Sequence, residues 1–332
     1  MSGLRSLFES YTSASPIFPN NAGATVTVPA SSKVGKVLDV MINSKLSAVP
    51  VVDDASGKPL FFLTLMDIIA YAMRVLSEED VRVSFLKRLT SWIHDDTAEV
   101  ENATAAAVFD AVAAGPKPPV CVLIQEEQSV AAAARMMLKN HANRALVIDP
   151  AAPEKVRTVL SMSRLLQLSA PFVSELDIHD VPIGKLGLGN PYCIVCHEDD
   201  DVYHAFRRMV AHYVPSMAVV DHDGRLVGNL SASDFKLMHF ESHYWSLLGK
   251  TVRAYLAEVH KHAFVTHDDR AATWDADAGR VLQSFTPQST FADVAAAMHR
   301  YRVHHIYVVD AQRRPIGVVS NRDVIREILH HI

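Results

Sequence analysis

Hydrophobic and polar residues follow one pattern four times along the chain, and the clearest copy lies at residues 301–329. Residues 306–309 are β-branched or aromatic and predict a buried strand. A polar turn at 310–315 separates them from a second apolar run at 316–319. Residues 320–323 then open a segment with helical apolar spacing. The pattern therefore predicts a strand, a tight turn, a second strand and a helix.

The other three copies share the spacing of this unit. Their first strands cover residues 46–53, 142–149 and 214–221, and all four end in Asp. The position that opens the following helix lies 14, 15, 13 and 13 residues beyond that Asp in the four copies. These helix-start residues are Asp67, Arg164, Asp234 and Asp323. A near-constant offset in four places indicates an internal repeat.

An amphipathic helix is predicted before each of these strands. Apolar residues at i, i+3, i+4 and i+7 form the stripe of a helix that packs on a sheet. Each unit is then β-α-β-β-α and too small to bury its sheet alone. We expect an α/β (α+β) fold in which four such repeats pair into two modules.

The predicted organisation has seven segments. They are an N-terminal segment (1–23), repeat one (24–77), a helical insertion (78–116), repeat two (117–170), a connector (171–189), repeat three (190–247) and repeat four (248–332). Within the insertion we expect one helix over 85–93 and an Ala-rich helix that ends at Gly115.

Composition narrows the class of protein. The 332 residues are 49% hydrophobic and 21% charged, which is typical of a globular chain. A net charge of −5 argues against general nucleic-acid or membrane-surface binding. Three cysteines favour a reducing compartment over a disulfide framework. No apolar stretch has the length of a membrane span and the start lacks a signal peptide, so we expect a cytosolic or nuclear protein.

Three helix starts combine a hydroxyl with a carboxylate three residues later. The pairs are Thr64 and Asp67, Ser231 and Asp234, and Ser320 and Asp323. A capping box explains each pair locally. The same groups also suit a ligand, because a helix N-terminus favours a phosphate and a carboxylate can accept from a ribose diol. The two interpretations are compatible, since one residue can do both.

With these residues in view, the chain resembles proteins built from CBS motifs, whose four copies form two Bateman modules in a flattened disc. The order Asp67, Arg164, Asp234, Asp323 is similar to the γ subunit of AMP-activated and sucrose-non-fermenting-type protein kinases. The runs at 143–150 and 303–310 carry the same likeness.

The resemblance implies a non-catalytic sensor that binds AMP, ADP or ATP between paired repeats, without a covalent cofactor. It places ribose on Asp67, Asp234 and Asp323, phosphates on Arg144 and His304 with His305 beside it, and Thr64, Ser231 and Ser320 along the sites. Arg164 would leave its own repeat without a ribose acceptor. The implied partners are a kinase α subunit and a scaffolding β subunit, with no nucleic acid and no membrane.

Four positions depart from the family pattern. Ser47, Asn143, Ser163 and His305 stand where the family has a basic residue, and His cannot offer the bidentate fork of Arg. Two alternatives therefore stay open: an interaction scaffold that no longer binds nucleotides, and a sensor of another adenosyl ligand such as S-adenosylmethionine.

Other motifs do not indicate catalysis or a metal. The C-x-x-C-H run at 193–197 matches a haem-attachment pattern, but its place predicts the first strand of repeat three. His304 and His305 fall on opposite faces of a strand, and the 17 histidines show no metal-ligand spacing. Because no nucleophile elbow, phosphate loop or kinase signature occurs, we expect a protein that is not an enzyme.

Overall fold

The computed structural model describes residues 3–13, 15, 25–77, 98–114, 120–189, 191–239, 247–265 and 284–332. These residues form four three-stranded sheets. In every sheet a short first strand runs parallel to the second, and the second pairs antiparallel with the third. The fourfold repeat and its β-α-β-β-α order are thus confirmed.

The first two repeats have the following elements. Repeat one contains β1 (Val28–Pro29), α2 (Val34–Asn43), β2 (Ala48–Val52), β3 (Pro59–Thr64) and α3 (Leu65–Val75). Repeat two contains β4 (Leu123–Gln125), α7 (Val130–Lys139), β5 (Arg144–Asp149), β6 (Ala152–Ser161) and α8 (Met162–Ser169).

The last two repeats follow the same order. Repeat three contains β7 (Val195–His197), α9 (Val202–Ala211), β8 (Ser216–Val220), β9 (Leu226–Ser231) and η3 (Ala232–His239). Repeat four contains β10 (Ser284–Phe285), α11 (Phe291–Arg300), β11 (His305–Val309), β12 (Pro315–Ser320) and α12 (Asn321–His330). The helix after β9 is 3₁₀, whereas α3, α8 and α12 are α-helices.

The repeats share a backbone feature that the sequence does not show. After the first helix of each repeat, one non-glycine residue takes a positive φ between 51° and 54°. These residues are Lys45, His141, Tyr213 and Arg302. The left-handed residue ends the helix and turns the chain into the next strand.

Further helices in the described part of the chain lie outside this pattern. They are α1 (Gly3–Glu9), α5 (Ala98–Asn102), α6 (Ala105–Ala113), η2 (Ala170–Glu175) and α10 (Val252–Val265). The expected Ala-rich helix is α6, which Thr104 caps. The expected helix over 85–93 lies outside the described residues. The helix α10 packs on α9 and η3, which belong to repeat three. A boundary between repeats three and four at residue 248, which assigns α10 to repeat four, therefore stays a prediction.

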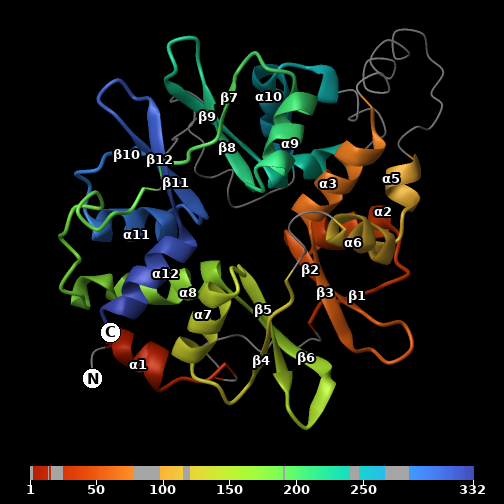
Figure 1. The fold of residues 1–332 in the computed structure, drawn as a ribbon, viewed down its shortest axis with the longest axis horizontal. Coiled ribbons are helices and arrows are strands. Elements are labelled where there is room, and N and C mark those ends of the chain that lie inside the picture. Colours follow the sequence, from red (N-terminus) through yellow and green to blue (C-terminus); the bar gives the residue numbers. More distant parts are fainter. Residues whose placement is uncertain are drawn as a thin grey trace.

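The sheets meet in two pairs (Figure 1). Ala48 and Phe62 of repeat one pack with Leu146 of repeat two. In the other pair, Ala218 and Leu226 of repeat three pack with Tyr307 of repeat four. The predicted pairing of neighbouring repeats into two modules is therefore confirmed.

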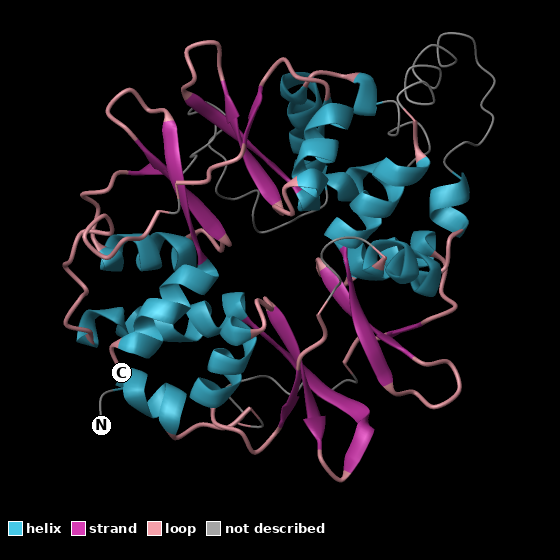
Figure 2. Ribbon diagram, in the orientation of Figure 1, coloured by secondary structure: helices cyan, strands magenta, loops and turns pink. Residues whose placement is uncertain are grey.

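Helices join the two modules and hold most of the core (Figure 2). The helices of repeat one pack with those of repeat three, and the helices of repeat two pack with those of repeat four. Leu4, Leu7 and Phe8 of α1 are buried in the second of these cores. The four repeats thus surround the centre of the molecule, and the sheet pairs alternate with the helix pairs around it (Figure 1).

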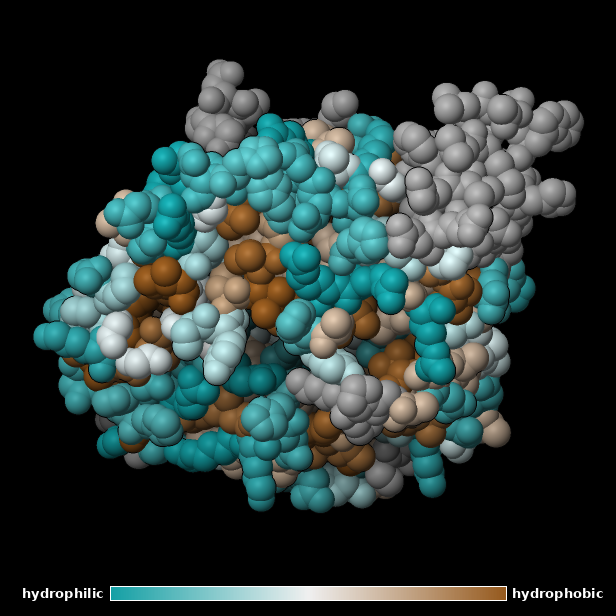
Figure 3. Space-filling view, turned by 45° about the horizontal axis from the view of Figure 1, so that its top comes forward, coloured by the Kyte–Doolittle hydropathy of each residue, from teal (hydrophilic) through white to brown (hydrophobic). Residues whose placement is uncertain are grey.

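On the face seen in Figure 3, hydrophobic side chains of the described residues lie in several groups among polar ones. Among the described residues, no helix combines the length and the apolar character needed to cross a membrane.

Candidate functional site

The Asp that ends each second strand has a local role. Asp53 Oδ1 accepts from the backbone N–H of Ser56 at 2.7 Å. Asp221 and Asp310 each accept two backbone N–H bonds from the turn that follows them. Hydrogen bonds with Ser56 lower the pKa of Asp53, as expected for a carboxylate that accepts N–H groups. The recurring Asp at the end of the second strand therefore stabilises the turn that leads to the third strand.

The helix-start carboxylates form the predicted caps. Thr64 and Asp67 make a full capping box, as do Ser320 and Asp323. Ser231 donates both its backbone N–H and its hydroxyl to Asp234 Oδ2, at 2.7 and 3.1 Å. At Arg164 the Ser161 hydroxyl caps the helix without a carboxylate. Capping boxes are thus shown for two pairs, and for Ser231 and Asp234 the bonds from Ser231 to the carboxylate are shown. Ligand binding by the same residues stays a prediction.

Asp67 and Asp323 differ in their surroundings. Burial raises the pKa of Asp67, because the charged form loses water that its two bonds with Thr64 only partly replace. Both bonds use Oδ2, and in the described part of the chain Oδ1 of Asp67 has no hydrogen-bond or ion-pair partner. Asp323 Oδ1 instead accepts from Arg326 on the same helix at 2.6 Å. Of these two carboxylates, Asp67 is therefore the one with an oxygen that has no partner among the described residues.

Arg144 lies at the start of β5 and reaches across to repeat one. Its Nη2 donates to the Ser47 hydroxyl at 2.5 Å. The backbone carbonyl of Ser47 accepts from Leu65 N–H, the residue directly after Thr64. Ser47, Thr64, Asp67 and Arg144 thus gather at one end of the first sheet pair, and we call this group the Arg144 junction.

The charge at the Arg144 junction is poorly compensated. Arg144 is half-buried, and this burial lowers the pKa of its guanidinium. Among the described residues its hydrogen bond goes to a neutral hydroxyl, and no carboxylate lies within ion-pair distance. A desolvated cation without a counter-charge is costly. An anion bound at this junction would remove that cost.

His305 occupies the equivalent position in repeat four, since both residues begin the second strand and pair with the helix-capping Ser of the third. Its Nε2 lies 3.1 Å from the Ser216 hydroxyl and 3.2 Å from Asn229 Oδ1. The Tyr307 hydroxyl donates to the same Asn229 oxygen at 2.6 Å. We call Ser216, Asn229, His305 and Tyr307 the His305 junction.

The side chains of the His305 junction are uncharged and form hydrogen bonds with one another. Burial, with a smaller contribution from the charge of His304, lowers the pKa of His305 from 6.5 to about 4. Burial also raises the pKa of Tyr307, so the phenol keeps the proton that it donates. The side chain of His305 therefore contacts repeat three as an uncharged group.

The remaining predicted residues lie nearby. His304 is exposed, and its carbonyl accepts from Asn321 N–H at the start of α12. The carbonyl of Asp234 accepts from the buried Tyr255 hydroxyl at 2.7 Å, which ties η3 to α10. The structure thus places Ser231, Asp234 and His305 at the second sheet pair, with Ser216 between them.

Sequence reasoning missed Arg322. Its Nη2 donates to the carbonyl of His141 at 2.6 Å and to Asn143 Oδ1 at 2.9 Å, so it reaches from repeat four to repeat two beside Arg144. Burial lowers the pKa of Arg322, while the charge of Asp323 raises it. Its place directly before a helix-start Asp was the only sequence signal. It supplies a cation next to Asn143, where the family pattern has a basic residue.

Two curated relatives resemble the chain over much of its length. Protein SDS23 of Candida glabrata is 23% identical over 305 residues, which cover 87% of this chain and 52% of that protein. The SNF1-related protein kinase regulatory subunit gamma-1 of Arabidopsis thaliana is 21% identical over 203 residues, which cover 59% of this chain and 47% of that subunit. The chain thus spans about half the length of the curated relatives it matches.

The fold and a family model agree. A crystal structure of a Methanocaldococcus jannaschii protein, described as a proposed archaeal homologue of γ-AMPK, superposes with a TM-score of 0.66 and 16% identity over 94% of this chain and 98% of that one. The family model of the CBS domain matches residues 24–74, 185–237 and 280–330, which lie in repeats one, three and four. Repeats one, three and four are therefore CBS domains.

Proposed function

We propose that this chain is a non-catalytic regulatory subunit that binds an adenine nucleotide at the Arg144 junction. The observation that carries the proposal is the half-buried guanidinium of Arg144, which bonds a neutral hydroxyl and has no carboxylate partner among the described residues. A phosphate supplies the missing negative charge. A ribose diol can donate to Oδ1 of Asp67, whose other oxygen caps α3.

The charge of the junction favours a phosphorylated ligand. S-adenosylmethionine carries a sulfonium cation at the place where AMP, ADP and ATP carry their phosphate. Arg144 would therefore repel this group of S-adenosylmethionine and attract the phosphate of a nucleotide. AMP, ADP and ATP share the adenosine and differ in charge. We therefore expect all three nucleotides to bind and S-adenosylmethionine to bind more weakly.

The regulatory role rests on likeness. The likeness to the Arabidopsis gamma-1 subunit supports a kinase α subunit and a scaffolding β subunit as partners. A ligand that binds two repeats at once changes the relative population of their arrangements only if its affinity differs between them. Co-elution of the purified chain with a recombinant kinase α and β pair, with and without AMP, tests this partnership separately from nucleotide binding.

The binding experiment is calorimetric titration of the full chain with AMP, ADP, ATP and S-adenosylmethionine. The test variant is Asp67→Ala, and Asp293→Ala is the matched control. Asp293 forms the same capping box with Thr290 at the start of α11, away from the helix starts that follow the third strands. The two variants lose the same kind of cap, so a difference between them reports ligand binding.

We expect Asp67→Ala to weaken AMP binding about tenfold while Asp293→Ala binds as the wild type does. Equal effects of both variants on unfolding, with unchanged AMP affinity, would show that Asp67 serves only as a cap. Absence of saturable binding for all four ligands would support an interaction scaffold. The His305 junction, whose side chains bond one another, is an example of such a contact between two repeats.

A further inference from the structure

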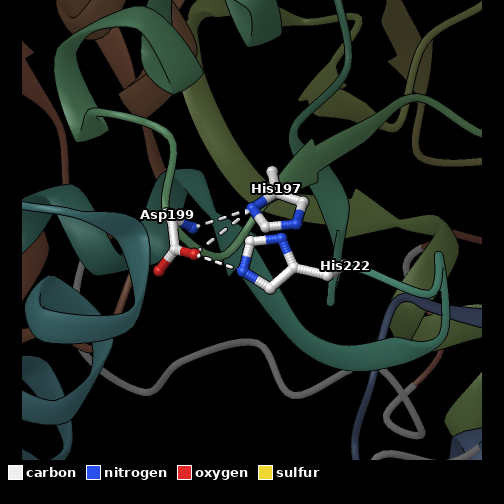
Figure 4. A group of neighbouring side chains, drawn as sticks. All are labelled: His197, Asp199 and His222. Carbon is white, nitrogen blue, oxygen red and sulfur yellow. Dashed lines mark hydrogen bonds and ion pairs between the residues drawn. The ribbon is translucent and has the colours of Figure 1, made fainter.

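Two imidazoles and a carboxylate meet on repeat three, outside the sheet junctions. His197 ends β7, Asp199 lies in the turn before α9, and His222 lies in the turn between β8 and β9. Figure 4 shows the three side chains facing one another. Asp199 Oδ2 lies 3.0 Å from His222 Nε2 and 3.8 Å from His197 Nδ1. Ligand atoms of all three lie within 4.8 Å of one another.

We propose that His197, Asp199 and His222 bind a divalent transition-metal ion, Zn²⁺ being the best match. Imidazole nitrogen and carboxylate oxygen are ligands of Zn²⁺ at about 2.0–2.2 Å, and three protein ligands with one water make a common four-coordinate set. Around a tetrahedral Zn²⁺ with such bonds the ligand atoms lie about 3.3–3.5 Å apart. The distances of 3.0 and 3.8 Å from Asp199 Oδ2 therefore need only small adjustments. His222 is 78% exposed and can make that movement by a change of rotamer.

Hydrogen bonds already orient the ligand atoms. The backbone N–H of Asp199 donates to His197 Nδ1 at 3.2 Å, so this nitrogen presents a lone pair, which metal binding would take over. The backbone N–H of His197 donates to Asp200 Oδ2 at 2.9 Å and fixes the turn. Arg253, paired with Glu198, lies 3.8 Å from Asp199 Oδ1 and leaves Oδ2 toward the imidazoles. Such outer contacts hold metal ligands in place.

Repeat one shows that the fold alone does not require this group. The strand register makes Ser31 equivalent to Asp199 and Asp54 equivalent to His222. There the Ser31 hydroxyl and backbone N–H donate to the two oxygens of Asp54 at 2.5 and 3.2 Å. A hydroxyl and a carboxylate are thus enough to join the two turns. The second imidazole in repeat three, at the place of Pro29, adds a metal ligand beyond that structural need.

A metal ion here would link two turns that are far apart in sequence, and it would act independently of nucleotide binding. Among the residues that the structure describes, this is the group of three or more His, Cys, Asp or Glu whose ligand atoms come so close. The consequence is a repeat three whose stability depends on the metal concentration.

The experiment uses the full chain after removal of metal with EDTA, titrated with Zn²⁺ by calorimetry and with Co²⁺ by visible absorption. The test variant is His222→Gln, whose amide can still donate to Asp199 but is a poor ligand for Zn²⁺. The control is His212→Ala, an exposed histidine at the other end of α9. Other metal-binding groups of the chain are the same in all three proteins.

We expect the wild type and His212→Ala to bind one more Zn²⁺ than His222→Gln, or the same number about tenfold more tightly. Their Co²⁺ complexes should show the d–d bands of a four-coordinate site, which His222→Gln lacks. Zn²⁺ should raise the Tm of the wild type and His212→Ala but not of His222→Gln. Equal Zn²⁺ affinity, stoichiometry and Tm response in the wild type and His222→Gln would overturn the proposal.

Discussion

The two sheet pairs place different chemistry at equivalent positions. At the Arg144 junction a guanidinium faces a neutral hydroxyl, Ser47, and lacks a counter-charge among the described residues. At the His305 junction an uncharged imidazole lies between Ser216 and Asn229. Both groups begin the second strand of a repeat and reach toward the preceding repeat. The same backbone thus supports one junction with a cation that lacks a counter-charge among the described residues and another whose imidazole is uncharged.

The difference extends to the next pair of positions along the strands. Phe62 and Leu146 pack together in the first sheet pair. The register places Asn229 and Tyr307 at the same positions in the second pair, where they form a hydrogen bond of 2.6 Å. The first pair therefore combines an apolar centre with a charged edge, whereas the second is joined by a polar network. A fold can conserve the contact between two sheets while it changes what the contact can bind.

The largest effect is expected from Arg144→His, which gives the first sheet pair the group found in the second. An imidazole buried in this place is uncharged near neutral pH and cannot replace the guanidinium. We expect AMP binding to weaken about 10–100-fold, because hydrogen bonds to charged groups contribute about 1.5–3 kcal/mol. Calorimetric titration measures this loss.

Arg144→Lys is the control for that substitution. It keeps the charge and loses the fork, so its AMP affinity should lie between those of the wild type and Arg144→His. Arg144→His removes a poorly compensated cation, so its free energy of unfolding should equal or exceed that of the wild type. Unchanged AMP affinity in Arg144→His would contradict the assignment of the nucleotide to this junction.

The His305 junction predicts a loss of stability on acidification, whereas the raised pKa of Asp67 at the Arg144 junction acts in the opposite direction. Burial, followed by the charge of His304, lowers the pKa of His305 from 6.5 to about 4. The unfolded chain therefore binds a proton between these values that the folded chain does not. Stability is fully present above pH 6.5 and falls as the pH drops toward 4. The loss at pH 4 should reach about 3 kcal/mol, from a shift of about 2.5 pKa units at 1.36 kcal/mol each.

Urea unfolding at several pH values between 7 and 4, compared between the wild type and His305→Gln, tests this. Glutamine can donate to Asn229 but does not titrate, so the difference in unfolding free energy between the two proteins should shrink or reverse as the pH falls. Asp53, Asp149 and Asp221 have lowered pKa values and lose their contribution only at still lower pH. Parallel pH curves for the two proteins would show that His305 is not buried in the neutral form.

The elements themselves could be predicted because their signals are local. Short β-branched, aromatic and apolar runs predicted the strands, helical apolar spacing predicted the helices, and the constant offset predicted four units. The pairs Thr64–Asp67 and Ser320–Asp323 were predicted as caps, since both residues of a capping box lie within one helical turn.

What the sequence could not supply are contacts between separate units. Ser47 looked like the loss of a basic residue, yet it accepts the hydrogen bond of Arg144 from another repeat. Asn143 looked like a second loss, yet it accepts from Arg322 of repeat four. His305 was predicted as a nucleotide contact, and its partners Ser216 and Asn229 depend on how two sheets face each other. Such pairs have no sequence period, because the register between sheets is set by packing.

The smallest effect is expected from Tyr307→Phe. The substitution removes the hydroxyl that donates to Asn229 Oδ1 and leaves His305 Nε2 as the neighbour of that oxygen. We expect the free energy of unfolding to fall by about 1 kcal/mol, the usual net contribution of one hydrogen bond. Tyr301→Phe, on a side chain that packs near Arg300, is the control and should change stability by less than about 0.5 kcal/mol.

The double variant Asn229→Phe with Tyr307→Leu gives the second sheet pair the apolar centre of the first. If the two pairs are alternative solutions for one backbone, the double variant should be less destabilised than the sum of its single variants, because both polar partners disappear together. A thermodynamic cycle of urea unfolding over the wild type, both singles and the double measures this coupling. Additive losses would show that Asn229 and Tyr307 contribute to stability independently. The difference between the two sheet pairs would then be limited to Arg144 and His305.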